Sequence, residues 1–361
     1  MNNTNKKTLS IEILPTEDCN NHCTYCIQKG MHKKVYLKEE QVDKIFDFIS
    51  SYRTYDSSVN QINIMLFGGE PLLNKPVCDK VFDYCAENYY NVSVITNGLL
   101  IDQYIDKLKV LSKKNLLNIQ ISYDGMEIHD KNRCNTSSQV LNAIDLLQRN
   151  GIKSLLLKAT IPLNGFDDIY KCWLEHINIL HMDYVPTIDY SFNALNDDNI
   201  DYYIKKFEVQ LLKIAKYCIK HNIKNPGTDL LRLNGKAMCT AGHYFAAFGS
   251  TLNISKCHGT AFEDPIIPEH IIGNVDDKDI NEKVKKAFDD HKVLETIVND
   301  ECINCDVTLC KKCCAVNYMY SNKVNYMDRW YDKNNNNLCK MYKMISKISK
   351  AYNYILQKNN K

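Results

Sequence analysis

The regular alternation of strand-like and helix-like segments over the first two thirds of the chain limits the possible folds more than any other feature. Amphipathic segments follow the apolar runs, and one of them places Val42, Ile45 and Ile49 on a single helical face. Six β/α units imply a parallel sheet with right-handed crossovers, and they are too few for an eight-stranded closed barrel. We therefore predict an α/β fold, a partial (β/α)6 barrel with strands at Leu9–Leu14, Gln61–Phe67, Asn91–Thr96, Asn118–Tyr123, Ser154–Ile161 and Asp183–Tyr190.

The alternation ends after Phe192, and the rest of the chain has a different character. We predict the partial barrel in residues 1–195, a linker helix in 196–235 and a small cysteine-rich α+β domain in 236–361. The last part holds eight of the 16 cysteines and few long helical patterns, so metal ligands rather than a large apolar core should organise it. A C-terminal helix should end the chain.

Charge and hydropathy exclude two kinds of partner. With 45 Lys and Arg against 43 Asp and Glu, the formal charge of +2 provides no general field for nucleic acid. The N-terminus has no apolar signal segment and the apolar runs are only strand-length, so we expect a cytoplasmic protein without a membrane partner. In a reducing compartment, cysteines are metal ligands or small buried side chains rather than disulfides. We expect the buried role for Cys78, Cys85, Cys134, Cys172 and Cys218.

Three other cysteines directly follow the first predicted strand. Cys19, Cys23 and Cys26 have the spacing C-x3-C-x2-C. Three thiolates within eight residues can surround one metal centre and leave a coordination position open, as in an iron–sulfur cluster with one free iron. A zinc knuckle that takes a distant fourth ligand is the alternative.

Polar and glycine-containing motifs follow the next three predicted strands. They are Gly68-Gly69-Glu70, Thr96-Asn97-Gly98 and Ser122-Tyr123-Asp124-Gly125, the last followed by Arg133. Two glycines at the end of a strand let the backbone approach a ligand without interference from Cβ atoms. Because the carboxyl ends of parallel strands meet at one edge, these motifs predict a ligand bound across the mouth of the barrel. Helix capping is the alternative for the residues after the fourth strand, taken singly.

From about Leu9 to Phe192 the chain resembles the radical S-adenosylmethionine (radical SAM) superfamily. The resemblance rests on the three spaced cysteines, on the aromatic Tyr25 before the last of them and on Gly68-Gly69-Glu70. It implies a [4Fe–4S] cluster on Cys19, Cys23 and Cys26, whose open iron binds the amino and carboxylate groups of SAM. The SAM contacts that it implies are Tyr25, Gly68, Gly69, Glu70, Asn97, Ser122 and Arg133.

The C-terminal cysteines form a dense knot from Cys302 to Cys314, preceded by two distant cysteines and followed by another. They resemble the SPASM extension of the superfamily, which carries two auxiliary iron–sulfur clusters. The resemblance implies that one cluster is held by Cys302, Cys305, Cys310 and Cys339, and the proximal one by Cys239, Cys257 and Cys314, with Cys313 as an alternative to Cys314. The proximal cluster then has an open iron, takes His243 as a ligand or is smaller. A pair of zinc ribbons is the alternative.

The resemblance implies an oxygen-sensitive enzyme that receives an electron from a flavodoxin or ferredoxin and uses a 5′-deoxyadenosyl radical to take a hydrogen atom from its substrate. SPASM enzymes mostly act on peptides. We therefore expect a maturase of a ribosomal peptide that performs a net oxidation, such as a cross-link or thioether. Only 18 residues precede Cys19, so we expect either a separate leader-recognition protein as a partner or a substrate that needs no leader.

Two other functions stay open. The first is an enzyme similar to anaerobic sulfatase maturases, which convert a protein Cys or Ser to formylglycine. Those enzymes carry an acid as general base directly after the cysteine matched by Cys257, where this chain has His258, so His258 is a candidate base. The second is a non-enzymatic electron carrier, for which the Gly68-Gly69-Glu70 motif has no purpose.

Overall fold

The computed structural model describes residues 7–26, 34–180, 187–190, 200–223, 244–262, 268–296, 305, 307 and 336–359. Within these ranges, nine strands form one sheet in the order β6-β5-β4-β3-β2-β1-β7-β8-β9. Each of the first six overlaps one predicted strand, and the predicted α/β partial barrel is confirmed. These six are parallel and comprise β1 (Lys7–Ile13), β2 (Val59–Leu66), β3 (Asn91–Thr96), β4 (Leu117–Ser122), β5 (Leu155–Ile161) and β6 (Thr187–Tyr190).

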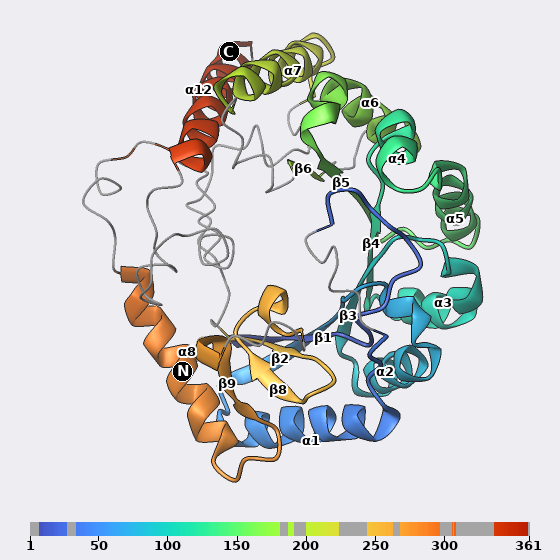
Figure 1. Ribbon diagram of the computed structural model, residues 1–361, viewed down its shortest axis with the longest axis vertical. Coiled ribbons are helices and arrows are strands. Elements are labelled where there is room, and N and C mark those ends of the chain that lie inside the picture. Colours follow the sequence, from blue (N-terminus) through green and yellow to red (C-terminus); the bar gives the residue numbers. More distant parts are fainter. Residues whose placement is uncertain are drawn as a thin grey trace.

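Helices cover the outer side of this curved sheet (Figure 1). In β2, Ile62, Ile64 and Leu66 are buried in the core with residues of these helices, whereas Asn63 and Met65 on the opposite face are only half-buried. The inner face of the barrel is therefore the more polar face. No described helix is long and apolar enough to cross a membrane. The outer helices are α1 (Glu39–Tyr55), α2 (Lys75–Asn88), α3 (Ile105–Lys113), α4 (Met126–Asn132), α5 (Ser137–Arg149), α6 (Ile169–Leu180) and α7 (Ile200–Lys220).

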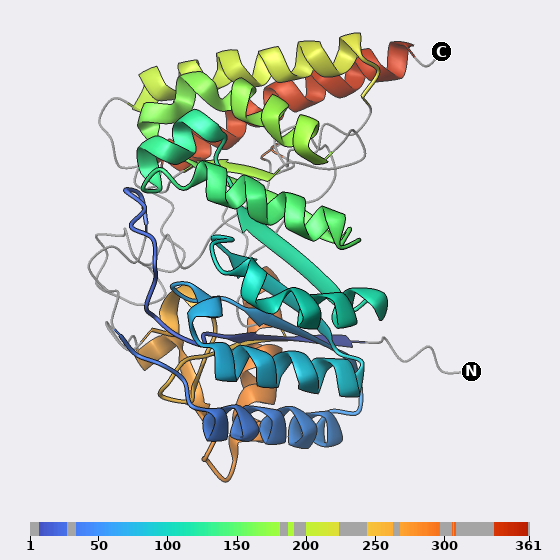
Figure 2. The same cartoon turned by 90° about the vertical axis from the view of Figure 1, so that its right-hand side faces the viewer.

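The C-terminal third contributes to both edges of the sheet. Strand β7 (Phe245–Phe248) pairs in parallel with β1, and the antiparallel strands β8 (Asn253–Ser255) and β9 (Ile271–Asn274) extend the sheet beyond it. Helix α8 (Ile280–Thr296) contacts α1 on this side. Helix α12 (Asn336–Asn359) lies along α7 near the opposite edge (Figures 1 and 2). The domain boundaries near residues 195 and 235 stay a prediction.

Two large hydrophobic cores occupy the described part of the molecule. The first packs α1, α2, α3 and α5 against β1–β4 and also includes residues of β7, β8 and α8. The second joins β5 to α6, α7 and α12, and its members include Trp173, Phe207 and Ile345. The C-terminal helix thus completes a core that begins with the last strands of the barrel.

Four of the five cysteines expected to be small buried side chains are buried, namely Cys78, Cys85, Cys172 and Cys218. Cys134 is exposed, so the expectation is wrong for this residue. It lies beyond the end of α4 with a left-handed backbone (φ 56°), in a turn rather than on the apolar face of a helix.

Candidate functional site

The cysteine loop, residues 19–26, follows β1 at the carboxyl end of the sheet. Its far side is tied to the end of α4, because the backbone N–H of Thr24 donates to the carbonyl of Asn132 (2.9 Å) and the Thr24 hydroxyl donates to the Asn132 side chain (2.7 Å). Cys19, Cys23 and Cys26 form no disulfide and are half-buried. The loop therefore presents three unbridged sulfur atoms at the mouth of the barrel.

The burial of these thiols affects how they bind a metal. Burial raises the pKa of Cys19 to about 12, and it also raises the pKa of Cys23, although the nearby Arg133 opposes that second shift. A bound cation reverses such a shift because it stabilises the thiolate directly. In the described residues no three His, Cys, Asp or Glu side chains are placed to hold one metal ion. An iron–sulfur cluster distributes its cysteine ligands over several irons, so the thiol donors of this loop fit a cluster.

The Gly68-Gly69-Glu70 motif at the end of β2 packs against the backbone that leads into the cysteine loop. A Cβ atom on Gly68 would lie less than 3.0 Å from the carbonyl oxygen of Thr16, and one on Gly69 would lie equally close to that of Asp18. The backbone N–H of Gly69 donates to Thr16 (3.1 Å) and that of Glu70 donates to Asp18 (2.8 Å). Both glycines are needed for this approach, which places the motif beside the cysteine loop.

The carboxylate of Glu70 connects the ends of β2 and β3. It is buried and accepts hydrogen bonds from the Thr96 hydroxyl (2.7 Å), the Asn97 backbone N–H (2.7 Å) and the Leu72 backbone N–H (3.2 Å). Burial raises its pKa to about 7, although these hydrogen bonds act in the opposite direction. The Asn97 side chain in turn donates to the side chain of Asn20 (2.7 Å). The end of β3 is thus also attached to the cysteine loop.

Arg133 and Asp124 form a buried ion pair beyond the end of β4, with Arg133 Nε 2.7 Å from Asp124 Oδ2. The hydroxyl of Tyr25 donates to the same carboxylate, and the Arg133 guanidinium lies 5.2 Å from the centre of the Tyr25 ring. Ser122 is half-buried two residues before Asp124 and pairs in register with Lys158 of β5. The structure thus brings Tyr25 and Arg133 together, and Ser122 lies nearby.

His258 lies in the short helix η5 (His258–Thr260) after Cys257, and its ring reaches β1 and the end of β2. Its Nδ1 is 3.0 Å from Oε2 of the buried Glu12, and its ring centre is 4.7 Å from that of Phe67. Phe67 directly precedes the Gly68-Gly69-Glu70 motif. A residue from the C-terminal third therefore stands next to the motif that was expected to bind SAM.

Sequence reasoning missed two residues of this region, Glu12 and Lys158. A signal existed for both, since Glu12 interrupts an apolar strand and Lys158 occupies an alternate position of another. Thr96 and Asp124 belong to the predicted strand-end motifs, but the sequence did not predict that they contact Glu70 and Arg133.

Most of the expected auxiliary ligands lie outside the described residues: Cys239, Cys302, Cys310, Cys313 and Cys314, together with His243. Of the others, Cys257 is buried, Cys305 is half-buried and Cys339 is exposed on α12. Their role as ligands stays a prediction.

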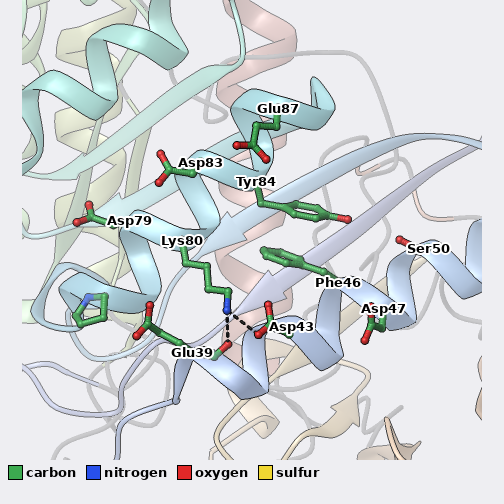
Figure 3. A pocket seen from close by; sticks show the side chains of 11 residues that line it. Glu39, Asp43, Phe46, Asp47, Ser50, Asp79, Lys80, Asp83, Tyr84 and Glu87 are labelled. Carbon is green, nitrogen blue, oxygen red and sulfur yellow. Dashed lines mark hydrogen bonds and ion pairs between the residues drawn. The ribbon is translucent and has the colours of Figure 1, made fainter.

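A groove of about 740 Å³ between α1 and α2 lies on the helical side of the molecule (Figure 3). Its lining is acidic and includes Asp43, Asp79 and Asp83, with an ion pair between Lys80 and Asp43 (2.7 Å) across the two helices. The groove is separated from the cysteine loop by the sheet and its core, so it takes no part in the candidate site.

Residues 13–177 match the family model of the radical SAM superfamily. This segment is a radical SAM domain, which is an enzyme domain. SAM and a [4Fe–4S] cluster are the cofactors of such a domain.

Three curated proteins show what the chain is similar to in sequence. Uncharacterized protein MJ0907 of Methanocaldococcus jannaschii is 36% identical over 32% of this chain and 38% of its own length. An S-adenosylmethionine-dependent nucleotide dehydratase of Fibrobacter sp. is 34% identical over 26% and 28%. A GTP 3′,8-cyclase of Clostridium perfringens is 26% identical over 63% and 67%. The chain thus spans well under half the length of the first two relatives.

Two solved structures share the fold over most of the chain. anSMEcpe with bound AdoMet and Cp18Cys peptide is 20% identical and has a TM-score of 0.68, covering 98% of this chain and 99% of that one. Streptococcus suis SuiB bound to precursor peptide SuiA is 13% identical and has a TM-score of 0.59, covering 88% and 74%. The described residues therefore share their fold with these two proteins.

Proposed function

We propose that this radical SAM enzyme is a peptide maturase, which removes a hydrogen atom from a residue of a ribosomal peptide and leaves it oxidised. The observation that carries the proposal is the position of His258, which brings the C-terminal third to the edge where the barrel strands end. Both solved structures with the same fold hold a peptide, which supports a substrate of this kind.

In this proposal Cys19, Cys23 and Cys26 hold the [4Fe–4S] cluster. Gly68, Gly69 and Glu70 receive the amino group of SAM beside it, because their backbone packs against the residues that lead into the cysteine loop. When bound, these cofactors supply the one-electron chemistry that removes hydrogen from an unactivated C–H bond. The remaining proposed SAM contacts are Tyr25, Asn97, Ser122 and Arg133.

His258 accepts the proton that the substrate loses on oxidation, as the base of the proposed reaction. Its Nδ1 faces the Glu12 carboxylate at 3.0 Å, and a carboxylate in this position holds an imidazole ring in one orientation. The His258 side chain is 41% exposed, whereas that of Glu12 is 1% exposed. The histidine therefore contacts the substrate, and Glu12 positions the histidine.

The C-terminal cysteines hold two auxiliary iron–sulfur clusters in this proposal, and these accept the electron that remains on the substrate. A flavodoxin or ferredoxin supplies the electron for SAM, and the peptide is either presented by a separate leader-recognition protein or bound without a leader. The partners follow from the chemistry, since the reaction needs an electron donor and a peptide held in place.

The test is to incubate the reduced, anaerobically purified enzyme and SAM with the short peptide encoded beside its gene. We expect a loss of two hydrogens by mass spectrometry, abolished in Cys19→Ala. Cys134→Ala is the matched control, because this cysteine is exposed nearby but lies outside the loop. An untouched peptide, with GTP consumed instead, would overturn the proposal in favour of the activity of the cyclase relatives.

The second candidate is the formylglycine-generating activity of a sulfatase maturase. It is supported by the match to anSMEcpe over almost the full length of both chains. Conversion of a sulfatase-motif Cys or Ser to the aldehyde, with the neighbouring peptide unchanged, is the result that selects it.

A further inference from the structure

One guanidinium group lies directly against the cysteine loop. Arg133 is buried at the C-terminal end of α4, with 7% of its surface exposed. Its Nη1 donates to Cys23 Sγ (3.6 Å, within the range of N–H···S contacts), and the guanidinium also faces the Tyr25 ring. This one cation therefore contacts two residues of the loop.

Asp124 holds this guanidinium in place. Its carboxylate has no exposed surface, and Oδ2 accepts hydrogen bonds from Arg133 Nε and from the Tyr25 hydroxyl. Oδ1 accepts a hydrogen bond from the backbone N–H of Thr160 (2.8 Å), at the end of β5. The pair is thus fixed to the sheet, and Arg133 cannot turn away from Cys23 without leaving Asp124 buried and unpaired.

We propose that Arg133, held by Asp124, tunes the [4Fe–4S] cluster on the cysteine loop: its hydrogen bond to Cys23 Sγ raises the reduction potential of that cluster. The proposal rests on Cys23 being a cluster ligand, as in the proposed function. Reduction adds one electron from the external reductant and hence one negative charge. A buried N–H donor and cation at a ligand sulfur stabilise that charge more than they stabilise the oxidised state.

The role is compatible with a contact to SAM. A guanidinium has five N–H donors, of which Asp124 and Cys23 take one each. Neither contact uses the Nη2 group. Arg133 is therefore a positioning and tuning residue for the cluster, whichever atoms SAM reaches.

The test is an EPR-monitored redox titration of the anaerobically reconstituted holoenzyme with dithionite. The signal that changes on addition of SAM, and that is missing in the triple variant of Cys19, Cys23 and Cys26 to Ala, belongs to this cluster. The double variant Arg133→Gln/Asp124→Asn replaces both buried charges by neutral amides, so that no unpaired charge stays buried. Arg53→Gln is the control, since Arg53 of α1 pairs with Tyr90 and the substitution makes the same Arg→Gln change far from the loop.

We expect the potential in the double variant to fall by at least 59 mV, which is a tenfold change in the equilibrium constant of a one-electron couple. Arg53→Gln should leave it unchanged, and Arg133→Lys should shift it less, because the charge remains. An unchanged potential in the double variant with normal iron content overturns the proposal. If the double variant loses the cluster, a wild-type potential in Arg133→Lys overturns it and a lowered one supports it. Failure to modify any peptide affects only the proposed function, since the potential is measured without substrate.

Discussion

The parallel part of the sheet has a first half, β1–β4, and a second half, β5 and β6. The hydrophobic cores that cover these two halves are built from different parts of the chain. Under β1–β4 the core comes largely from successive β/α units, so that partners in space are also close in the chain. Around β5 the core depends on α12, which begins at residue 336, whereas α7, its partner, ends at residue 220. The first core is therefore built mainly from successive β/α units, with additions from β7, β8 and α8, whereas the second requires α12 from near the C-terminus.

The residues expected to bind the cofactors lie in the first half, whereas the C-terminal helix α12 packs on the second half. The cysteine loop, the glycine motif and Glu70 all belong to the first half, and the hydrogen bonds described above that join them lie within residues 16–136. Helix α12 contributes to none of those contacts. Damage to the two halves should therefore have different consequences, which the following experiments measure.

The largest effect should come from changing Cys19, Cys23 and Cys26 together to alanine. SAM cleavage should fall to the background rate, since no thiolate remains on the loop to hold the cluster. The measurement is 5′-deoxyadenosine formed per enzyme under dithionite, with iron content determined in parallel. Retention of the C-terminal iron is expected, and full SAM cleavage in this variant would exclude the loop as the cluster site.

A matched pair of core truncations compares the two halves directly. Ile345→Ala in α12 and Ile64→Ala in β2 each remove a buried side chain, at a cost of about 2–5 kcal/mol in the free energy of unfolding. Urea unfolding under anaerobic conditions gives this cost. We expect only Ile64→Ala to disturb the SAM-dependent EPR signal as well, because β2 leads into the glycine motif. Equal disturbance by both variants would show that the halves are coupled.

The stability of the second half should fall in acid because of His176 in α6. Burial lowers the pKa of this histidine to about 4 from its ordinary 6.5, so the folded state keeps it neutral. Its contribution to stability is present above pH 6.5 and is lost as the pH falls through 4, by about 3 kcal/mol at 1.36 kcal/mol per pKa unit. His176→Asn should flatten the pH dependence of unfolding in this window, whereas the exposed His221→Gln should leave it as steep as in the wild type.

The stability of the first half should change with pH in the opposite direction, because of Glu70. Because burial raises the pKa of Glu70 from 4.5 to about 7, its contribution is full below pH 4.5 and is lost as the pH rises through 7, again by about 3 kcal/mol. Glu70→Gln should remove this loss in SAM-free enzyme, with the exposed Glu87→Gln as control. If Glu70→Gln still loses the same free energy of unfolding as the pH rises through 7, the loss comes from another titratable group.

The sequence by itself determined the strands of the barrel and the place of the cofactor motifs. Apolar alternation marks β1 to β5 because each strand must bury one face under its own helices, and this need is visible in a window of a few residues. The cysteine loop and the glycine motif could be placed at the same edge because parallel strands all end there.

Only the tertiary structure decided how these parts meet. The pairing of Glu12 with His258, the contact of Arg133 with Cys23, the extension of the sheet by β7 beside β1 and the packing of α12 on α7 each join residues far apart in the chain. Such pairs leave no periodic trace in the sequence, because a side chain that contacts a distant partner does not constrain the residues next to it. The same holds for Asp124, whose burial and three hydrogen bonds depend on β5 and the cysteine loop reaching it from opposite sides.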